Sequence, residues 1–324
     1  MEIASKYNEA LLQHLKAVVK VKAPSKLYKP IEYIVSLGGK RLRPILTLMT
    51  CDIFDTDFEK AMNAALAVEL FHNFSLIHDD IMDQAPLRRN KATVHEKWDL
   101  NTGILSGDAM LIRAYQLFED YEPSMFRELA ILFSKTAIQV CEGQQYDLDF
   151  EKRDDVALKD YIKMIDFKTA VLIGAAMKMG AIVAKAPKSC CDNIYEFGRN
   201  LGLAFQLQDD YLDTFGDEAT FGKRVGGDII SNKKTFLYLT AIERGNKEEA
   251  QTLRHLFSIS PKDPSGKIET VTKIFESTGA SVFAQNKIEF YTQKAHTVLK
   301  KVNISEENKQ LLNNFGNALM NRKV

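Results

Sequence analysis

One acidic pentapeptide occurs twice in this sequence, as Asp79–Asp83 (DDIMD) and Asp209–Asp213 (DDYLD). In each copy, the first and last carboxylates stand at positions i and i+4, which lie on one face of a helix about one turn apart. An apolar interior cannot hold such charges unpaired, so a cation must neutralise them. Two such clusters facing each other across a cavity would bind several hard divalent cations, most simply Mg²⁺. Proteins use these ions chiefly to bind phosphates.

The surroundings of both copies strengthen this interpretation. Apolar helices are predicted over residues 61–83 and 196–213, and each acidic cluster falls in the last turns before a helix breaker, Pro86 or Gly216. The C-terminal end of a helix carries the negative pole of its dipole, so acidic residues there destabilise the helix unless a cation is bound. Two solvated helix ends rich in Asp are the alternative, and the repetition of the motif argues against it.

Basic residues cluster close to the first acidic motif. Gly38–Pro44 (GGKRLRP) places three cations just before a helix predicted to begin near Pro44, and Arg88 and Arg89 follow Pro86. Clustered Lys and Arg side chains on a flexible backbone suit a diphosphate. A charge run is usually a solvated face, and the position of these runs beside acidic motifs favours a binding site instead.

A polar stripe runs along each of the two predicted helices. At about 100° per residue, polar side chains upstream of each motif line up with its aspartates. A histidine on such a face is often a hydrogen-bonded core residue, although this one could contact the same anionic ligand as the aspartates. The stripes consist of His72, Ser75, Asp79 and Asp83 on the first helix and Gln206, Asp209 and Asp213 on the second.

Composition limits the classes of function. The chain has 324 residues and a formal net charge of zero, so no global field attracts nucleic acid or an anionic membrane. The first residues lack the apolar core of a signal peptide, and the most apolar run, Ala170–Ala184, is interrupted by Lys178 and too short for a bilayer. We therefore expect a cytoplasmic protein without a membrane anchor and without a nucleic-acid partner.

The residue pattern predicts an all-α fold. Long stretches of good helix formers with helical spacing dominate, and alternating strand-like runs are nearly absent. Gly, Pro and Ser clusters are too sparse for a linker, so residues 1–324 are expected to form one domain, with Ser258–Gly266 as a loop between helices. The four cysteines show no metal-ligand spacing and are expected to be reduced packing residues: Cys51, Cys141, Cys190 and Cys191.

Several catalytic motifs are excluded. Gly216–Lys223 resembles a phosphate loop only superficially, because Arg224 replaces the Ser or Thr that would hold Mg²⁺. The sequence has no GxGxxG following a predicted strand and no GxSxG elbow. Hydride transfer on a Rossmann fold and hydrolysis by a serine nucleophile are therefore poorly supported.

Taken together, these motifs resemble the trans-isoprenyl diphosphate synthases, the head-to-tail polyprenyl synthetases that make farnesyl, geranylgeranyl and longer diphosphates. The resemblance covers nearly the whole chain. It implies a single large helical bundle of the isoprenoid synthase type, with the active-site cavity between central helices. The residues that carry it are Gly38–Pro44, His78–Asp83, Leu87–Arg89, Lys168–Thr169, Phe205–Asp213 and Gly222–Lys223.

The resemblance also implies a role for each matching residue. Three Mg²⁺ ions per active site would bridge the allylic diphosphate to Asp79, Asp83, Asp209 and Asp213. Isopentenyl diphosphate would bind Lys40, Arg43, His72 and Arg89, and the allylic diphosphate would bind Arg88, Lys168, Lys223 and Lys233, with Thr169 and Gln206 at the reacting centre. Asn232 departs from the family, which usually has Gly before the lysine matching Lys233. The residues expected to act in catalysis itself are Asp79, Asp83, Arg88, Lys168, Asp209 and Lys223.

Product length is expected to depend on the wall of an apolar tunnel below the first motif. In the family, the fifth and fourth residues before the motif form its floor, and these are Phe74 and Ser75 here. An aromatic followed by a small residue resembles short-chain enzymes, so geranylgeranyl diphosphate is favoured over farnesyl diphosphate or longer products. Phe71 either reinforces the floor or is ordinary core packing.

Relatives in this family are usually homodimers, so a homodimer is expected. Three rival functions share parts of the pattern. A terpene cyclase would normally lack the second DDxxD motif and GGKRLRP, and a head-to-head synthase of the squalene type is disfavoured for similar reasons. A non-catalytic subunit of a heteromeric synthase would typically lose an acidic motif, and this chain has both. Whether Arg322 and Lys323 close over the site is left open.

Overall fold

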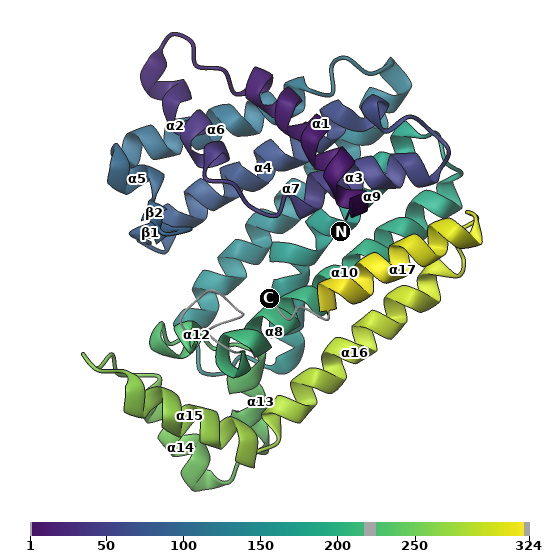
Figure 1. Cartoon of the computed structure of the whole chain (residues 1–324). Helices are drawn as coiled ribbons and strands as arrows, with labels where there is room; N and C mark the ends of the chain where they lie inside the picture. Colours follow the sequence, from purple (N-terminus) through teal and green to yellow (C-terminus); the bar gives the residue numbers. More distant parts are fainter. Residues whose placement is uncertain (1, 217–224, 321–324) are drawn as a thin grey trace. The chain divides into compact units, whose positions relative to one another are not determined.

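The computed structural model describes residues 2–216 and 225–320. Figure 1 shows a chain built almost entirely of α-helices, which confirms the predicted all-α fold. Among the described residues the strands form a single short antiparallel hairpin, with β1 (Leu87–Arg88) paired to β2 (Lys91–Ala92) in the register Leu87 to Ala92 and Arg88 to Lys91. No described helix is both long enough and apolar enough to span a bilayer.

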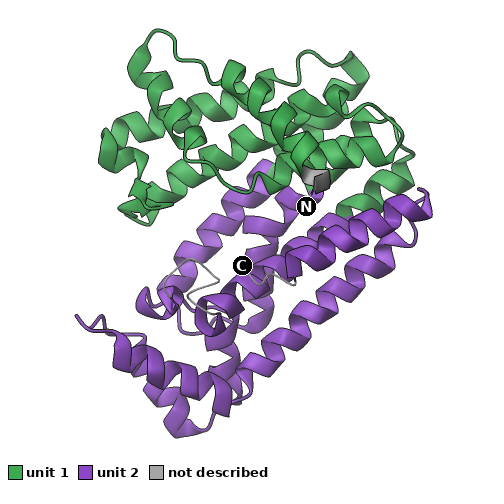
Figure 2. Ribbon diagram, viewed as in Figure 1, with its two compact units in different colours: residues 1–136, 175–195 green, residues 137–174, 196–324 purple. Residues whose placement is uncertain are grey.

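The described chain divides into two compact units, coloured separately in Figure 2. Unit 1 comprises residues 1–136 and 175–195, and unit 2 comprises residues 137–174 and 196–324. The prediction of one domain over residues 1–324 stays a prediction. Unit 1 contains α1 (Glu2–Val18), α2 (Ser25–Ser36), α3 (Leu42–Ile53), η1 (Phe58–Ala61), α4 (Met62–Met82), α5 (Val94–Lys97) and α6 (Leu100–Gln116).

Three helices contribute residues to both units: α7 (Pro123–Glu151), α9 (Val171–Val183) and α10 (Lys188–Phe215). The remaining elements belong to unit 2. They are α8 (Leu158–Ile165), the π-helical turn η2 (Asp166–Ala170), α12 (Gly227–Ile230), α13 (Phe236–Arg244), α14 (Lys247–Leu256), α15 (Ser265–Ser277), α16 (Ala280–Leu299) and α17 (Glu306–Met320).

The core of unit 1 is centred on α4, which packs against α3 and α6. Nearly every residue of α4 between Met62 and Phe74 is buried, as expected for a helix that is apolar on all sides. Gly107 lets α6 approach α4 closely, because a Cβ at this position would overlap the His78 ring. The apolar run at 170–184 forms the buried helix α9, consistent with its many small residues.

The core of unit 2 is formed by side chains from α8, α10, α13, α15 and α16. Phe236 of α13 stacks on Phe283 of α16, with ring centroids 5.8 Å apart. Arg199 of α10 pairs with the buried carboxylate of Asp166 at the start of η2. The Arg199–Asp166 pair joins η2 to the middle of α10, and these two elements carry most of the functional residues predicted for this unit.

Predicted element boundaries were close, with three differences. Helix α10 begins at Lys188 rather than 196, because the pattern upstream is also helical. Helix α3 begins at Leu42, ahead of Pro44, since the left-handed conformation of Arg41 (φ 47°) ends the preceding loop. Pro44 still lies within the first turn, where a missing N–H is tolerated. The loop predicted at 258–266 is present between α14 and α15, but it ends earlier, because α15 begins at Ser265.

The packing role predicted for the cysteines holds for three of them. Cys51, Cys190 and Cys191 are buried, and all four thiols are free. The prediction was wrong for Cys141, which is exposed, because it lies on the solvent face of α7.

Candidate active site

The first acidic motif lies at the C-terminal end of α4 in unit 1, and its aspartates have different environments. Asp80 is 1% exposed and accepts hydrogen bonds from Arg88 Nε at 2.9 Å (Oδ1) and 2.8 Å (Oδ2). Burial raises the pKa of the Asp80 carboxyl, and the Arg88 guanidinium opposes that rise. Asp79 is half-buried and Asp83 is exposed. Asp80, the middle aspartate of the three, therefore has a structural partner, and the outer two, Asp79 and Asp83, are more exposed to solvent.

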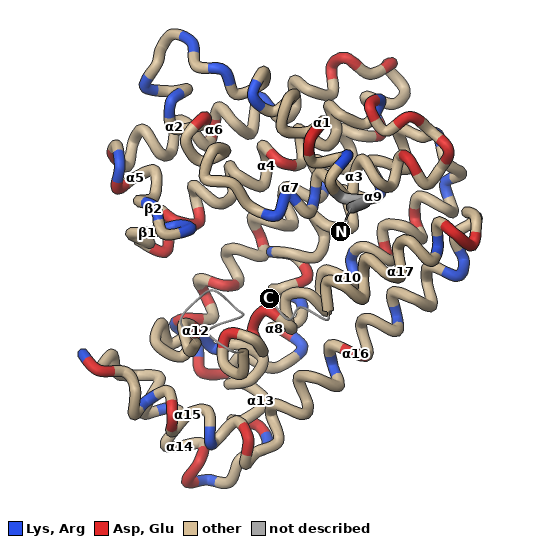
Figure 3. The backbone as a smooth tube through the Cα atoms, viewed as in Figure 1, with Lys and Arg blue, Asp and Glu red and all other residues tan. Residues whose placement is uncertain are grey.

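The β1–β2 hairpin positions two of the predicted arginines. Arg88 ends β1, and Arg89 and Asn90 form the two-residue turn with left-handed φ angles of 54° and 61°. This is the turn geometry that matches the twist of a tight hairpin. Thr93 fastens the hairpin to the end of α4 through a 2.8 Å hydrogen bond from its Oγ1 to the Ala85 carbonyl. Acidic and basic residues lie side by side at this hairpin (Figure 3).

The three cations of the GGKRLRP segment have different positions. Arg41 is buried, forms an ion pair with Glu69 and donates to the Val35 carbonyl, so it holds the loop in place. Lys40 is exposed in the loop between α2 and α3. Arg43 points to α4, where its Nη1 lies 3.3 Å from His72 Nε2. The roles expected for Lys40 and Arg43 in binding isopentenyl diphosphate stay predictions.

Arg43, His72 and Arg89 form a cationic cluster around the start of α3. Burial lowers the pKa of Arg43 to about 10, and its buried Nε atom makes no hydrogen bond to the described residues. Burial, followed by the charges of Arg43 and Arg89, holds the pKa of His72 well below its ordinary value. His72 is therefore neutral and accepts through Nε2. The cluster carries unbalanced positive charge and a buried donor, which suits an anion.

Gly39 is what allows Arg89 to reach this cluster. Its φ is 127°, a conformation that favours glycine, and a Cβ at this position would lie 2.6 Å from Arg89 Nη2. The backbone of the GGKRLRP loop therefore lies directly against the Arg89 guanidinium. Three of the four residues predicted to bind isopentenyl diphosphate come together in unit 1 in this way.

Aromatic residues line α4 upstream of its acidic motif. Phe74 is 8% exposed, and its ring centroid lies 5.5 Å from that of Phe71 and 4.7 Å from the His78 ring. Phe71 is fully buried and also contacts Phe133 edge-on at 5.2 Å. The Ser75 hydroxyl donates to the His72 carbonyl at 2.8 Å, so it is engaged within its own helix. Phe74 is thus held between two rings, one turn before the motif.

The second acidic motif lies in the last turns of α10 in unit 2, and its middle aspartate again has structural partners. Asp210 is 6% exposed and accepts from the Tyr161 hydroxyl and from Gln206 Nε2, the latter at 3.1 Å. Burial, followed by the charge of Asp228, raises the pKa of Asp210 to about 8. Asp209 and Asp213 are half-buried, and Asp213 Oδ2 accepts from the Asp228 amide at 2.8 Å.

Thr169 and Gln206 belong to the same network as Asp210. The Thr169 hydroxyl donates to Gln206 Oε1 at 3.1 Å, which orients the Gln206 amide toward Asp210. Lys168 and Thr169 lie in the π-helical turn η2, and such turns occur frequently at functional sites. Thr169 and Gln206, both expected at the reacting centre, therefore lie in contact near the second motif within unit 2.

Sequence reasoning missed two residues of α7 beside Lys168. Asp147 accepts from Lys168 Nζ at 2.5 Å, and Gln144 is buried with neither amide atom hydrogen-bonded to the described residues. Gly143 precedes them and lies so close to the backbone of Lys168 that any side chain would overlap it. The spacing Gly143-Gln144-x-x-Asp147, a glycine before two polar residues on one helix face, was the available signal.

The remaining predicted residues are placed as follows. Lys233 lies between α12 and α13, where its amide donates to the Asp228 carbonyl at 2.9 Å. Asn232, just before it, adopts the left-handed conformation (φ 58°), which glycine reaches without strain. Lys223, Arg322 and Lys323 lie outside the described residues.

The acidic motifs fit a magnesium ion that shares its coordination with another ligand. Within residues 2–216 and 225–320, no three His, Cys, Asp or Glu side chains converge closely enough to form a complete metal site. Mg²⁺ is typically held by one or two carboxylates, with water and substrate phosphate completing an octahedral shell. The outer aspartates of each motif supply carboxylates one turn apart, as that arrangement requires.

Comparisons with known proteins identify the family. Residues 24–275 match the family model described as polyprenyl synthetase. The chain is 40% identical over 229 residues to a protein of Methanosarcina mazei named geranylgeranyl diphosphate synthase, covering 70% of this chain and 71% of that one. It is 36% identical over 298 residues to one of Aeropyrum pernix named geranylfarnesyl diphosphate synthase, covering 90% and 92%.

Solved structures are similar over nearly the full length. A crystal structure titled geranylgeranyl pyrophosphate synthase has a TM-score of 0.95 and 51% identity, with 99% of each chain covered. Another, from Corynebacterium glutamicum, has a TM-score of 0.86 and 26% identity, again with 99% of each covered. Its title describes a geranylgeranyl pyrophosphate synthase complexed with isoprenyl diphosphate and magnesium.

Proposed function

This chain belongs to the polyprenyl synthetase family, and we propose that it is a short-chain trans-prenyltransferase. It condenses isopentenyl diphosphate head-to-tail with an allylic diphosphate, namely dimethylallyl, geranyl or farnesyl diphosphate, and releases diphosphate. The observation that carries this proposal is that the aspartates within each acidic motif have different environments. In each, a buried middle aspartate is engaged by protein donors, while the outer pair lies on the more exposed side.

Isopentenyl diphosphate binds the cationic cluster of unit 1. Arg43 is half-buried, and its Nε donor makes no hydrogen bond to the described residues, while neutral His72 holds Arg43 in place through Nε2. Arg89 lies against Gly39 on the same loop, and Lys40 extends from it. Planar guanidinium groups bind phosphate oxygens in pairs, which fixes the orientation of the diphosphate and hence of the attached isopentenyl group.

The allylic diphosphate is bound by the other basic residues together with magnesium. Arg88 is oriented by Asp80, and Lys168 is oriented by Asp147. Lys223 and Lys233 complete the set proposed from the resemblance. Asp79 and Asp83 in the first motif, and Asp209 and Asp213 in the second, would hold Mg²⁺, with three ions per active site. When bound, Mg²⁺ neutralises charge that develops on the departing diphosphate.

In such a reaction, the side chains of this protein stabilise charge and exclude water. Cationic groups placed where negative charge grows lower the barrier to breaking the allylic carbon–oxygen bond. The new carbon–carbon bond then forms from the isopentenyl double bond, and the released diphosphate takes the final proton. Apolar helix faces exclude water from the reactive carbon. No protein nucleophile is needed, and Thr169 and Gln206 line the reacting centre.

Geranylgeranyl diphosphate is the product that the sequence and the relatives favour. Phe74 and Ser75 form the floor of the chain-elongation tunnel, and Phe71 supports Phe74 from behind. One relative is named for a twenty-carbon product and one for a product five carbons longer. Because the Phe74 ring is held between Phe71 and His78, it presents a fixed obstacle to further growth.

The active form is a homodimer. Helix α6 in unit 1 exposes Leu105 (59%) and Ile112 (60%), which lie seven residues apart on one face, and α7 exposes Ile131 (56%). Large apolar side chains exposed at helical spacing are typical of helix-packed subunit interfaces. Light scattering should give the mass of a dimer, and Leu105→Glu combined with Ile112→Glu should give a monomer.

A cytoplasmic location stays a prediction.

Release of diphosphate tests the reaction class and separates it from the rivals. Purified chain with Mg²⁺ should release diphosphate only when isopentenyl and allylic diphosphates are both present. Release from the allylic substrate alone would indicate either a terpene cyclase or hydrolysis of the allylic diphosphate. No release with any substrate pair would indicate a non-catalytic subunit.

A further inference from the structure

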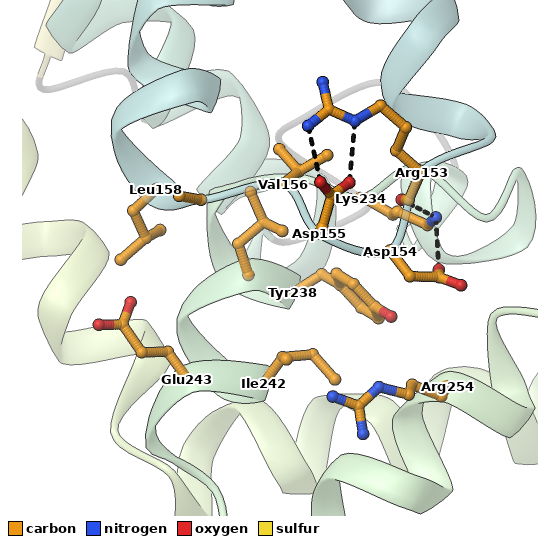
Figure 4. Close-up of a pocket in the computed structure, with 12 residues that line it drawn as sticks. Arg153, Asp154, Asp155, Val156, Leu158, Lys234, Tyr238, Ile242, Glu243 and Arg254 are labelled. Atoms are coloured by element: carbon orange, nitrogen blue, oxygen red, sulfur yellow. Dashed lines mark hydrogen bonds and ion pairs between the residues drawn. The ribbon is translucent and has the colours of Figure 1, made fainter.

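Two lysines hold the segment that carries Lys233, which runs from Ser231 to Thr235 between α12 and α13. The first is Lys234. Its Nζ donates to the Arg153 carbonyl and to Asp154 Oδ1, the latter at 3.0 Å, and both acceptors belong to the connection between α7 and α8 (Figure 4). The Lys234 side chain is only 12% exposed. The residue that follows Lys233 is therefore fastened to another part of unit 2.

The second lysine acts on the residue that precedes Lys233. Lys267, from α15, donates through Nζ to the side-chain oxygen of Asn232 and to the Ile259 carbonyl, the latter at 3.0 Å. Asn232 adopts a left-handed conformation that glycine would reach without strain. Glycine could not, however, accept this hydrogen bond. Asparagine at this position thus provides the required backbone conformation and an anchoring point.

Lys267 is an unusual lysine. It is 4% exposed, and its Nζ contacts an amide oxygen and a backbone carbonyl, with no carboxylate partner among the described residues. Its ammonium group also lies 5.5 Å from the centroid of the Phe257 ring. Burying a cation without an opposite charge is unfavourable, and burial lowers the pKa of Lys267. If Lys267 served only to pack α15 against its neighbours, an apolar residue at this position would make the folded protein more stable.

We propose that Lys267 is a positioning residue that, through Asn232, fixes Lys233 for contact with the allylic diphosphate. This inference rests on the role proposed for Lys233. The Lys267 ammonium group contacts Asn232, Ile259 and the Phe257 ring. Together with Lys234, it restrains both neighbours of Lys233, so less side-chain and backbone freedom is lost when substrate binds.

Steady-state kinetics on the full chain test this proposal. Lys267→Met keeps the length of the stem and removes the ammonium, and Asn232→Gly keeps the backbone conformation and removes the acceptor. Each should raise the KM for the allylic diphosphate about tenfold, with the KM for isopentenyl diphosphate unchanged. The double variant should be no worse than either single variant, because both remove the same hydrogen bond. Lys267→Arg, which retains a donor, should restore much of the affinity.

Lys273→Met is the matched control, because Lys273 lies on the same helix and is exposed, and its one ion pair within residues 2–216 and 225–320 is to Glu269 at 2.6 Å. It should change neither KM. Lys267→Met overturns the proposal if it lowers the melting temperature while leaving both KM values unchanged, or if it raises both equally. Lys233→Ala separates the two claims. If it raises the allylic KM while Lys267→Met does not, only this inference fails. If Lys233→Ala changes neither KM, the proposed role of Lys233 fails and the inference fails with it.

Discussion

The Arg88 guanidinium lies along the carboxylate of Asp80, with Nε 2.9 and 2.8 Å from its two oxygens and Nη2 2.7 Å from Oδ1. Asp80 is the second residue of the first acidic motif, so this contact engages one carboxylate of the motif with protein. In the second motif, Asp210 likewise accepts hydrogen bonds from Tyr161 and Gln206. Each DDxxD motif therefore combines a structural aspartate with two outer aspartates suited to bind metal.

Substitution of Asp80 should have a different effect from substitution of Asp79. Asp79→Asn removes a proposed metal ligand and should lower kcat by about 10²-fold or more. Asp80→Asn leaves the outer pair intact and weakens the orientation of Arg88, so we expect a higher KM for the allylic diphosphate and about a tenfold smaller loss of kcat. Equal losses of kcat in the two variants would contradict this division of roles.

Metal removal should abolish activity without unfolding the protein. Because no three potential ligands converge within the described residues, the ions depend on substrate oxygens for part of their coordination. EDTA should therefore stop turnover and Mg²⁺ should restore it, while the melting temperature without substrate stays nearly constant. Addition of diphosphate with Mg²⁺ should raise the melting temperature, and Asp209→Asn should weaken that shift. A large fall of the melting temperature in EDTA alone would indicate a structural metal instead.

Replacing Phe74 by Ala should lengthen the product. The Phe74 ring is held by Phe71 and His78, so its removal opens space that neighbouring rings do not readily fill. Mass analysis of the dephosphorylated alcohols should show chains at least five carbons longer. Phe133→Ala is the control, because Phe133 contacts Phe71 and Tyr115 in the core and should lower stability by about 3–5 kcal/mol without lengthening the product. An unchanged product from Phe74→Ala would reject the floor.

His72 should make the protein less stable in mild acid. Burial and the neighbouring arginines hold the pKa of His72 well below 6.5, its value when unfolded. Between the folded pKa and pH 6.5 the unfolded chain binds the extra proton and the folded chain does not. Stability therefore falls as pH drops below about 6.5, by at most about 1.4 kcal/mol per pH unit for this residue.

Melting temperatures of the wild type and of His72→Gln at pH 7.5 and 5.5 measure this effect. The wild type should lose more stability between the two values than the variant does. The exposed residue His14 provides the control variant, His14→Gln, which should follow the wild type. The same loss in the wild type and in His72→Gln would show that His72 is protonated in the folded state.

Local patterns in the sequence predicted the features that depend on neighbouring residues. The spacing of Asp79 and Asp83 predicted one helix face, and the apolar run of α4 predicted its burial. The pattern did not show that Asp80 is engaged by Arg88, because that contact depends on the β1–β2 hairpin. Arg41 has a structural role because it pairs with Glu69, whereas Arg43 does not. The local pattern could not show this, since Glu69 lies 28 residues from Arg41 along the chain.

The functional residues that the sequence did not reveal also depend on long-range contacts. Asp147 and Gln144 belong to a helix whose relation to Lys168 arises only when Gly143 packs against the η2 backbone. The π-helical turn itself has no periodic signature, because it inserts a single irregular turn between α8 and α9. The buried position of Lys267 is equally hidden, since a lysine on an amphipathic helix is ordinarily expected to face solvent.

The most direct test of the central claim is the identity of the product. The purified chain is incubated with Mg²⁺, isopentenyl diphosphate and, separately, dimethylallyl, geranyl or farnesyl diphosphate, and the dephosphorylated products are identified by mass. We predict linear all-trans alcohols, with the twenty-carbon alcohol as the end product from each primer. A cyclic hydrocarbon, or the absence of any condensation product from the chain on its own, would contradict the proposed function.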